Sequence, residues 1–412
     1  MRRRSFLGAL GALPFGGRGL PRGRRPVTGA GSPRVVVVGA GAFGGWTALY
    51  LLRGGAAVTL LDAWGPGNAR ASSGGETRVI RATYGSRAVY TRLTVRALAL
   101  WHDHAARWRR PLFRPTGVLW MVSREDDAYE RAALPVLTDA GMAHEVLQPS
   151  DLARRYPQID RAGVRWAIYE RDSGYLAARD ACAAVVEGFV AEGGDYRQLA
   201  AQPAALRGNA VTGLTLSDGT TLVADRYVFA CGPWLGALFP DVVGDRIRPT
   251  RQEVFFFGTP PGDARFRDDA LPVWVDHGER FMYGIPGNFH RGFKIADDTH
   301  GPPFDPTTGD RSPTAEGVRA VRRYLGSRFP DLRDAPLLEA RVCQYEITPD
   351  EGFLVDRHPA AGNAWLVGGG SGHGFKHGPA LGELVAGCVL ERRAPEPAFA
   401  LARLGVPAPP RR

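Results

Sequence analysis

A glycine-rich turn between two short apolar segments constrains the fold of this chain more than any other feature. Residues 34–38 form a β-branched run, which is typical of a buried parallel strand, and the glycine-rich segment 39–44 follows it directly. A helix is expected over residues 46–52, and then a second strand over 57–61 that ends at Asp62. This order of strand, glycine turn, helix, strand and acid predicts a nucleotide-binding βαβ unit.

The three glycines of this turn, Gly39, Gly41 and Gly44, occupy the GxGxxG positions. They would let the backbone approach a pyrophosphate, whose negative charge is favoured at the N-terminus of the following helix. Asp62 would accept hydrogen bonds from a ribose. A GxGxxG motif also occurs in glycine turns that bind nothing, but here every neighbouring element of the βαβ pattern is present.

Two later segments repeat the pattern of a short strand that runs into glycine. They are residues 227–234, which include Gly232, and residues 364–370. The segment that follows Asp62 is not another run of strands and helices, as an NAD domain would have, but contains a polar loop at residues 72–81. Widely separated strand–glycine segments favour a nucleotide domain assembled from discontinuous parts of the chain, as in many flavoproteins.

Aromatic, strand-like runs lie between the nucleotide segments. They predict one sheet over the bound cofactor, built from residues 117–122, 252–257, 273–275 and 281–284. A helix is expected near 125–141. Another is expected to begin with Ser312 as its cap and Pro313 in its first turn, with one apolar face made by Val318, Val321, Leu325 and Phe329.

Two lysines stand among 50 arginines, and both lie in apolar, glycine-rich surroundings. Lys294 belongs to Gly-Phe-Lys-Ile, and Lys376 belongs to Gly-His-Gly-Phe-Lys. A compact ammonium is not interchangeable with a guanidinium fork, so these lysines indicate buried sites where the smaller cation is needed. The alternative is that both are ordinary surface lysines.

The net charge of +10 gives little support for binding to nucleic acid. Residues 1–34 hold eight arginines and no acid, which leaves only +2 for the rest of the chain. The same segment begins with Arg-Arg-Arg-Ser-Phe-Leu and resembles a twin-arginine export signal over residues 1–32. The alternative is an arginine-rich tail on a cytoplasmic protein. No apolar run reaches the roughly 18 residues of a membrane span.

The four cysteines form no CxxC pair and have no metal-ligand spacing with histidine, so no metal site is expected. Cys182, Cys231 and Cys388 are expected to pack as small apolar residues, although the sequence leaves a disulfide open. His373 and His377 are four residues apart, but the glycines around them predict a loop and not a metal-binding helix.

Four motifs make the chain resemble the D-amino-acid-oxidase superfamily of FAD enzymes, and within it the family of monomeric sarcosine oxidase and N-methyltryptophan oxidase. The resemblance extends over about residues 33–395. Its motifs are the GxGxxG turn with its acid, the Gly-Glu-Thr-Arg-Val-Ile-Arg loop at 75–81, the Cys-Gln-Tyr segment at 343–345 with Asp-Glu-Gly-Phe at 350–353, and Ser-Gly-His-Gly-Phe-Lys at 371–376.

The resemblance implies an α/β (α+β) fold. A Rossmann-like FAD-binding domain is built from discontinuous segments, and a substrate domain contains a large mixed or antiparallel β-sheet. The expected parts are an FAD-binding domain from residues 33–114, 176–249 and 341–395, a substrate-binding domain from 115–175 and 250–340, the N-terminal signal or linker at 1–32, and a C-terminal tail at 396–412.

The resemblance also implies that FAD is attached through a thioether between Cys343 and the 8α-methyl carbon of the flavin. That reaction needs a thiolate, and the tether prevents loss of the cofactor and tunes its potential. The alternative for Cys343 is a small buried hydrophobic residue. Arg78 matches an arginine beside the flavin ring. The other positions assigned to the cofactor are Gly39, Gly41, Gly44, Asp62, Thr77, Gly232, Gly370, Gly372, Gly374 and Lys376.

Five residues match catalytic positions of the family. Lys294 matches a lysine over the flavin that promotes its reaction with oxygen, because a fixed positive charge stabilises the developing anion. Arg81 and Lys376 match the pair that binds the carboxylate of the substrate. Tyr283 and Tyr345 match positions near the substrate. The alternatives are a surface ion pair for Arg81 and core packing for the two tyrosines.

Two positions depart from the family pattern. Asp298 stands where close relatives carry a histidine four residues after the oxygen-activating lysine, and Gly74 replaces a histidine common near the flavin. An acid near Arg81 and Lys376 could compete for the carboxylate or receive an amino group. Both departures weaken the case for sarcosine itself as the substrate.

The predicted function is therefore that of an FAD-dependent amine oxidase. A secondary or N-methyl amino acid is oxidised at its C–N bond to an imine, and O₂ is reduced to H₂O₂. The expected partners are the small-molecule substrate and O₂, with no nucleic acid and no integral membrane segment, and the protein is expected to be a monomer. The alternatives are a flavin dehydrogenase of the same fold with another electron acceptor, and a non-catalytic exported flavin- or NAD-binding protein.

Overall fold

The computed structural model of the protein describes residues 31–204 and 206–405. The export signal predicted at residues 1–32 lies outside these residues except for its last two positions, as do residues 406–412 of the predicted tail. Within the described ranges, no helix is both long and apolar enough to cross a membrane.

A parallel sheet organises the nucleotide-binding part. Its central strand β1 lies between β2 and β15, in register with both, and its valines are almost completely buried because both faces of the sheet are covered. The order across the sheet is β21-β22-β15-β1-β2-β9, and β21 is the one antiparallel strand among them. The strands are β1 (Arg34–Val38), β2 (Ala57–Leu61), β9 (Asp195–Arg197), β15 (Arg226–Phe229), β21 (Leu354–His358) and β22 (Ala361–Gly368).

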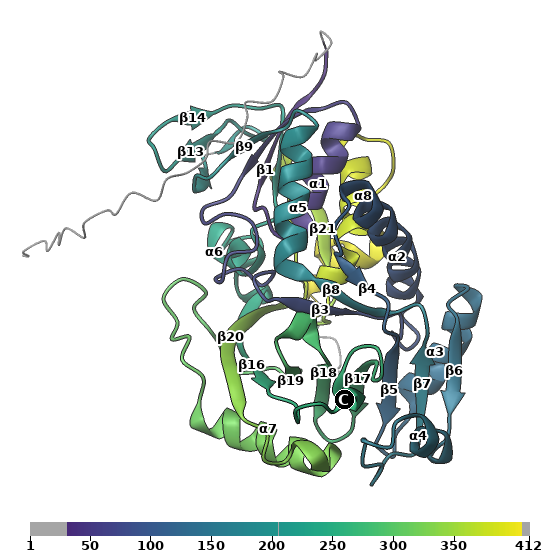
Figure 1. Cartoon of the computed structure of the whole chain (residues 1–412). Coiled ribbons are helices and arrows are strands. Elements are labelled where there is room, and N and C mark those ends of the chain that lie inside the picture. Colours follow the sequence, from purple (N-terminus) through teal and green to yellow (C-terminus); the bar gives the residue numbers. More distant parts are fainter. Residues whose placement is uncertain (1–30, 205, 406–412) are drawn as a thin grey trace, which may run out of the picture.

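Three helices pack together against this sheet. Helix α1 (Ala42–Arg53) contacts α5 (Ala178–Ala191) and α8 (Gly378–Val389), and α2 (Ala88–Trp108) contacts α8 from outside (Figure 1). Segments from the beginning, middle and end of the chain therefore build one layer. This arrangement confirms the predicted Rossmann-like part made of discontinuous segments.

A second, eight-stranded sheet forms the other half of the molecule (Figure 1). Its order is β20-β16-β19-β18-β17-β5-β7-β6, and all neighbours are antiparallel except β17 and β5. The predicted large mixed sheet is thus confirmed. The strands are β5 (Val118–Val122), β6 (His144–Leu147), β7 (Trp166–Glu170), β16 (Arg248–Phe257), β17 (Val273–His277), β18 (Phe281–Ile285), β19 (Phe293–Asp297) and β20 (Leu337–Ile347).

The strand register brings four predicted site residues to one face of the large sheet. Lys294 of β19 and Cys343 of β20 lie opposite residues of β16 that are four positions apart, so both point to the same side. Tyr345 follows Cys343 by two residues, and Tyr283 of β18 lies opposite the residue two positions after Lys294. The alternation of side chains therefore places all four on that face.

Smaller elements complete the fold. A three-stranded sheet, in the order β3-β8-β4, lies between the two large sheets and carries the predicted Thr-Arg-Val-Ile segment in β3 (Figure 1). The remaining strands and helices are β3 (Thr77–Ile80), β4 (Phe113–Arg114), β8 (Gly174–Ala177), β10 (Ala201–Pro203), β11 (Leu206–Arg207), β12 (Ala210–Val211), β13 (Leu214–Leu216), β14 (Thr221–Leu222), α3 (Ala128–Asp139), α4 (Pro149–Arg155), α6 (Leu235–Leu238) and α7 (Ala315–Arg328).

Two segments near the expected boundaries have a defined secondary structure. Residues 341–347, assigned above to the FAD-binding part, lie in β20 of the large sheet, where they pair with residues 248–254 of β16. Residues 397–405, assigned to a tail, form two short 3₁₀ helices that pack on the nucleotide part. Phe399 is fully buried there against Tyr90 and Phe353, so its apolar side chain holds this segment of the predicted tail on the nucleotide part.

The cap of α7 differs from the prediction. Thr314, and not Ser312, is the N-cap residue, and its hydroxyl accepts a hydrogen bond from the backbone N–H of Gly317. Pro313 therefore precedes the cap. The predicted apolar face is present, since Val321 and Leu325 are buried in the core under the large sheet.

Candidate active site

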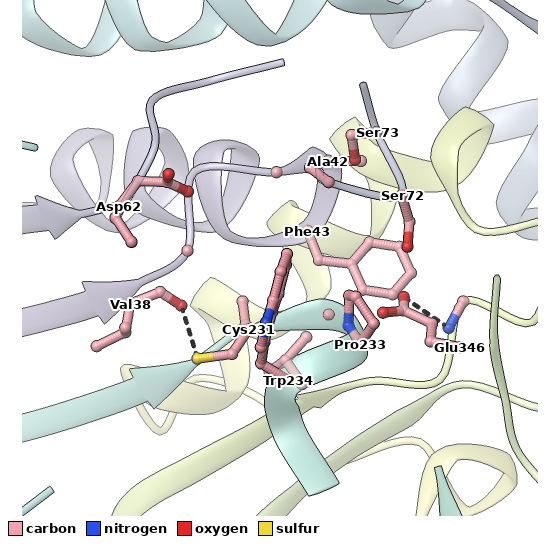
Figure 2. Close-up of a pocket in the computed structure, with 18 of the residues that line it drawn as sticks. Val38, Ala42, Phe43, Asp62, Ser72, Ser73, Cys231, Pro233, Trp234 and Glu346 are labelled. Atoms are coloured by element: carbon pink, nitrogen blue, oxygen red, sulfur yellow. Dashed lines mark hydrogen bonds between the residues drawn. The ribbon is translucent and has the colours of Figure 1, made fainter. Parts of the chain in front are cut away.

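A cavity of about 390 Å³ lies at the carboxyl ends of the parallel strands. Its wall begins at the glycine turn after β1, passes Asp62 at the end of β2 and continues to Arg78 of β3 and Tyr345 of β20. Ligands of open α/β sheets bind at this edge. Figure 2 shows the side chains of Phe43, Trp234 and Glu346 around the same space.

The glycines of the turn have different physical roles. A Cβ atom on Gly39 would lie 2.3 Å from the carbonyl oxygen of Ala230, and one on Gly44 would lie 1.8 Å from the carbonyl oxygen of Gly39. Both glycines are therefore required by the packing of the protein itself. Gly41 meets no such backbone obstacle, since its nearest neighbour would be the Ser73 hydroxyl at 3.3 Å, and it lines the cavity. A side chain at Gly41 would occupy space that a ligand can use.

Asp62 is held by backbone donors on both carboxylate oxygens. One oxygen accepts from Ala40 N at 2.8 Å, and the other accepts from Trp64 N at 2.9 Å and Gly65 N at 2.8 Å. Burial raises the pKa of Asp62, and the three N–H groups oppose that rise. The side chain ties the end of β2 to the glycine turn and keeps lone pairs at the cavity wall, where a ribose can donate.

The lining of this cavity fits an extended dinucleotide such as FAD. The predicted cofactor positions Gly39, Gly41, Asp62, Arg78, Gly232, Gly370, Gly372 and Gly374 all line it. Glycines from three separate loops leave the backbone open to a ligand, and aromatic side chains contribute flat apolar surface. Thr77 does not line it and contacts Lys294 instead.

A second, smaller cavity of about 60 Å³ adjoins the first, because Arg78, Tyr345 and Gly372 line both. The predicted catalytic residues Arg81, Lys376, Tyr283 and Tyr345 line it, together with Cys343 and Asp298. The fold thus collects residues from β3, β18, β20 and the loop before α8 around one space. Three cations, Arg78, Arg81 and Lys376, lie in its wall, which makes it suited to a carboxylate.

Two of these cations rest on aromatic rings. The Arg81 guanidinium lies 4.8 Å from the centre of the Tyr84 ring and 4.5 Å from that of Trp120, and the Lys376 ammonium lies 5.3 Å from the Tyr84 ring. Arg81 and Lys376 are only 6% and 4% exposed. Lys376 also donates to the carbonyl oxygen of His373 at 2.7 Å. Tyr84 is thus a shared support for two charges that the surrounding apolar core would otherwise disfavour.

Two histidines hold the Tyr84 hydroxyl. His373 Nε2 lies 2.9 Å from the carbonyl oxygen of Glu351, which can only accept, so a neutral His373 is protonated there and accepts from Tyr84 through Nδ1 at 3.1 Å. Tyr84 then accepts from His377 Nε2 at 2.9 Å. Burial and two nearby cations hold the pKa of His377 well below its ordinary value. The pair lies in a loop with a single 3₁₀ turn, as predicted, and orders the base of the small cavity.

Cys343 lies beside a permanent positive charge. Its Sγ is 3.4 Å from Arg78 Nη2, and Arg78 is fixed by the carbonyl oxygens of Ser72 and Thr77 at 2.7 and 2.9 Å. All four cysteines are free thiols.

The other three thiols are packing residues. Burial raises the pKa of Cys182 to about 12 and raises the pKa of Cys231 and Cys388 as well, so these thiols stay protonated. The described residues include no group of three or more His, Cys, Asp or Glu side chains that could hold a metal ion.

Lys294 is 1% exposed and lies beside β3, not on the wall of either cavity. Its Nζ donates to the Thr77 carbonyl oxygen at 2.8 Å and lies 3.3 Å from the Thr77 hydroxyl. Burial, followed by the positive charge of Arg78, holds the pKa of Lys294 well below its ordinary value. The burial predicted for this lysine is therefore seen. Its hydrogen-bond partner Thr77 directly precedes Arg78, whose side chain lines both cavities.

Asp298 directly follows the last residue of β19 and lines the small cavity. Tyr345 donates its hydroxyl proton to Asp298 Oδ1 at 2.5 Å. Burial and the charge of Asp298 raise the pKa of Tyr345 well above its ordinary value and raise that of Tyr283 as well. Both phenols are therefore protonated donors, and the aspartate is held as an acceptor at the cavity wall.

Sequence reasoning missed Glu346 and Tyr84. Glu346 directly follows a residue of the Cys-Gln-Tyr motif, and Tyr84 lies just beyond the loop at 75–81. Neither position has a periodicity or spacing that separates it from ordinary strand or loop residues. Gly74, noted above as a departure, contributes its carbonyl oxygen to Arg179 and lines neither cavity.

The fold and the site together define a flavin-dependent oxidoreductase. Residues 34–387 match the family described as "DAO: FAD dependent oxidoreductase". A monomeric sarcosine oxidase of Bacillus sp. (strain NS-129) is 30% identical over 362 residues, which cover 85% of this chain and 91% of that protein. The chain therefore belongs to the DAO family of FAD-dependent oxidoreductases, as its motifs predicted.

Further relatives support the same assignment. An N-methyl-L-tryptophan oxidase of Salmonella arizonae is 28% identical over 371 residues, covering 87% of this chain and 95% of that protein. The L-proline dehydrogenase from P. horikoshii has a TM-score of 0.80 at 20% identity, covering 91% of this chain and 98% of that one. Amadoriase II, a fructosamine oxidase from Aspergillus fumigatus, has a TM-score of 0.72 at 24% identity, covering 90% and 89%. The two structures share the fold.

Proposed function

We propose that this FAD-dependent enzyme is an amine oxidase that acts on a secondary or N-methyl amino acid. The substrate loses two electrons and two protons at its C–N bond and becomes an imine, and O₂ gains them as H₂O₂. The observation that carries this proposal is the convergence of Arg81 and Lys376 on the small cavity that adjoins the FAD cavity. Bound FAD supplies the two-electron redox chemistry.

The residues of the small cavity act by binding and orientation. Arg81 and Lys376 would bind the carboxylate, and charge-assisted hydrogen bonds from two directions fix its position. A fixed carboxylate also fixes the neighbouring C–N bond, and such positioning is a major part of catalysis. The protonated Tyr283 lies in the same wall, and Tyr345 donates its hydroxyl proton to Asp298. The apolar rings around them keep water away from the cations, which strengthens each contact.

We assign the reaction with oxygen to Lys294. Its ammonium is compact, buried and fixed by Thr77, the residue before Arg78, whose side chain lines both cavities. A compact ammonium and a guanidinium fork are not interchangeable in such a position. Electron transfer to O₂ builds negative charge, which such a cation stabilises.

We also propose that Cys343 carries FAD covalently through its sulfur. Its Sγ lies 3.4 Å from Arg78, and Cys343 lines the small cavity that adjoins the FAD cavity. We expect acid-denatured wild-type protein to retain its yellow colour and flavin fluorescence on the polypeptide, and the Cys343→Ser variant to release all of its flavin into the supernatant. Denaturing electrophoresis with fluorescence detection measures this.

The matched control for this test is Cys182→Ser, which removes a buried thiol whose raised pKa keeps it protonated. This variant should retain the flavin on the polypeptide as the wild type does. Free flavin released from denatured wild-type protein would disprove the tether and leave FAD bound only by non-covalent contacts.

The position of Asp298 in the cavity wall suggests to us a substrate that carries a second polar group. Its carboxylate accepts from Tyr345 at the wall of the cavity that also holds the carboxylate-binding pair, and a carboxylate is a charged acceptor for an amino or hydroxyl group. We propose that the enzyme prefers amino acids that carry such a donor over sarcosine. A peroxide assay against a panel of N-methyl, cyclic and glycated amino acids tests both the reaction and this preference.

We expect Asp298→Asn to lower kcat/KM for donor-bearing members of the panel by roughly tenfold or more, because a hydrogen bond to a charged acceptor is worth about 1.5–3 kcal/mol. Members without a second donor should change little. An equal loss for both groups would show that Asp298 only supports the fold of the cavity. Absence of activity with every member would reject the proposed function.

One alternative is a dehydrogenase of the same fold that passes electrons to a quinone or protein acceptor. Anaerobic reduction by the substrate, followed by exposure to air, separates the two, because an oxidase is reoxidised rapidly and a dehydrogenase is not. A second alternative is a non-catalytic exported flavin- or NAD-binding protein, for which no amine would bleach the flavin. The paired cations argue against a passive binder.

We further propose that the enzyme acts as a monomer and is exported by the twin-arginine route. The second proposal rests on the arginine-rich N-terminal segment of the sequence, and export of folded protein through that route would allow FAD to be bound beforehand.

A further inference from the structure

Two of the described residues that line the FAD cavity are acids, Asp62 and Glu346. Both oxygens of Asp62 accept backbone N–H donors, as shown above. Glu346 differs. Its Oε1 accepts from Gly370 N at 3.1 Å, but its Oε2 is buried without a hydrogen-bond partner among the described residues. A buried oxygen of this kind costs free energy unless a ligand satisfies it.

The surroundings of Glu346 place it at the cavity wall. A Cβ atom on Gly232 would lie 2.9 Å from Oε2, and one on Gly370 would lie 2.8 Å from Oε1, so only glycine at these two positions leaves the carboxyl group its space. The residue is 7% exposed and lines the cavity. Figure 2 shows Glu346 and its bond to the backbone beside Phe43 and Pro233.

No positive charge neutralises this carboxyl group. None of the described lysine, arginine or histidine side chains forms an ion pair with Glu346, and burial raises its pKa to about 7. The charged and titratable groups on the other walls of the cavity are Arg78, Asp62, Cys231 and Tyr345. Of these, Asp62 adds a second acid, and burial raises the pKa of Cys231 and of Tyr345, which keeps both protonated.

We propose that Glu346 is a direct ligand of FAD, and that it binds as a neutral carboxylic acid whose Oε2–H donates a hydrogen bond to an oxygen of the cofactor. FAD carries a negatively charged diphosphate, and a second negative charge in the same low-dielectric cavity would be repelled. The proton removes that repulsion and makes the group a donor. This inference rests on FAD binding alone and needs neither amine oxidation nor reaction with oxygen.

The test is the dissociation constant of FAD as a function of pH. It is measured by quenching of flavin fluorescence on the full-length apoprotein, in a Cys343→Ser background so that binding is reversible. Glu346 must take up a proton on binding once it is ionised in the apoprotein. The dissociation constant should therefore be nearly constant below pH 7 and rise by up to about tenfold for each pH unit above it.

Glu346→Gln is the matched variant, because its amide keeps both an acceptor for Gly370 N and an N–H donor but does not titrate. In the same background its dissociation constant should stay within about threefold of the parent at pH 6 and should lose the parent's rise above pH 7. Glu346→Leu should weaken binding at every pH. Thermal unfolding of the apoproteins shows whether each variant is folded.

Parallel pH profiles for the parent and Glu346→Gln would overturn the proposal, as would tighter binding at higher pH, which would mean that the ionised carboxylate accepts from FAD. Both measurements omit substrate and oxygen. A failure here would therefore leave the amine oxidase proposal standing, and inactivity toward every amine would leave this result unchanged.

Discussion

Replacing Lys294 with Met should slow the reaction of the reduced enzyme with oxygen by roughly 10²- to 10³-fold, the cost of removing one preorganised charge or donor from such a site. Because Lys294 is 1% exposed and its ammonium is held by Thr77, no other described lysine can supply a positive charge at the same position without moving. Reduction of the flavin by substrate should remain largely intact, because Lys294 lines neither cavity. Stopped-flow measurement of the two half-reactions separates the effects.

The pH dependence of the rate constant with oxygen gives a second test of the role of Lys294. Burial lowers the pKa of Lys294, so its ammonium loses the proton at a lower pH than an exposed lysine, whose pKa is about 10.4. The charged form exists below that lowered pKa. The rate constant with oxygen should therefore fall as pH rises through it, while the Lys294→Met variant should show no such step.

The matched control is Arg280→Met, which removes an exposed positive charge at the turn between β17 and β18. It should leave both half-reactions unchanged. Unaltered oxygen kinetics in Lys294→Met would refute the assigned role and would favour the dehydrogenase alternative.

Replacing Arg81 with Met should weaken binding of the amino acid by roughly 10- to 150-fold, which corresponds to one charge-assisted hydrogen bond of about 1.5–3 kcal/mol. The remaining cation, Lys376, would keep part of the affinity. The loss should be largest in KM and in the binding step of flavin reduction. Anaerobic titration of flavin reduction against substrate concentration measures it.

A substrate analogue with a carboxamide in place of the carboxylate makes this test specific. The wild type should strongly prefer the acid over the amide, and Arg81→Met should lose most of that preference. Arg92→Met on the exposed side of α2 is the control and should keep it. An equal loss for acid and amide would assign Arg81 a structural role on the rings of Tyr84 and Trp120.

Local patterns predicted the nucleotide half of this protein well. The strand, glycine turn, helix and acid from residue 34 to Asp62 depend on contacts that are close in sequence, and the structure has them with small shifts at their ends. The strand–glycine segment near 227–234 pairs with β1, and the one near 364–370 pairs with β15, so both join the same parallel sheet. Lys294 and Lys376 are both buried, as their apolar neighbours indicated.

Other features could not be read from local patterns. The place of residues 341–347 in the large sheet depends on a partner strand almost 100 positions away in the chain. The buried state of Phe399 depends on a pocket made by Tyr90 and Phe353. The family motifs indicated candidate site residues, but they did not show which of these residues line the same cavity.

The sequence by itself determined a nucleotide-binding βαβ unit, the family, and two unusual lysines, because these depend on residue chemistry and short-range spacing. Only the tertiary structure decided that Arg81 and Lys376 share one aromatic support, that Asp298 accepts from Tyr345, and that one oxygen of Glu346 has no hydrogen-bond partner within residues 31–204 and 206–405. These facts depend on the approach of distant strands and loops, whose geometry is set by packing of the whole core and not by any single segment.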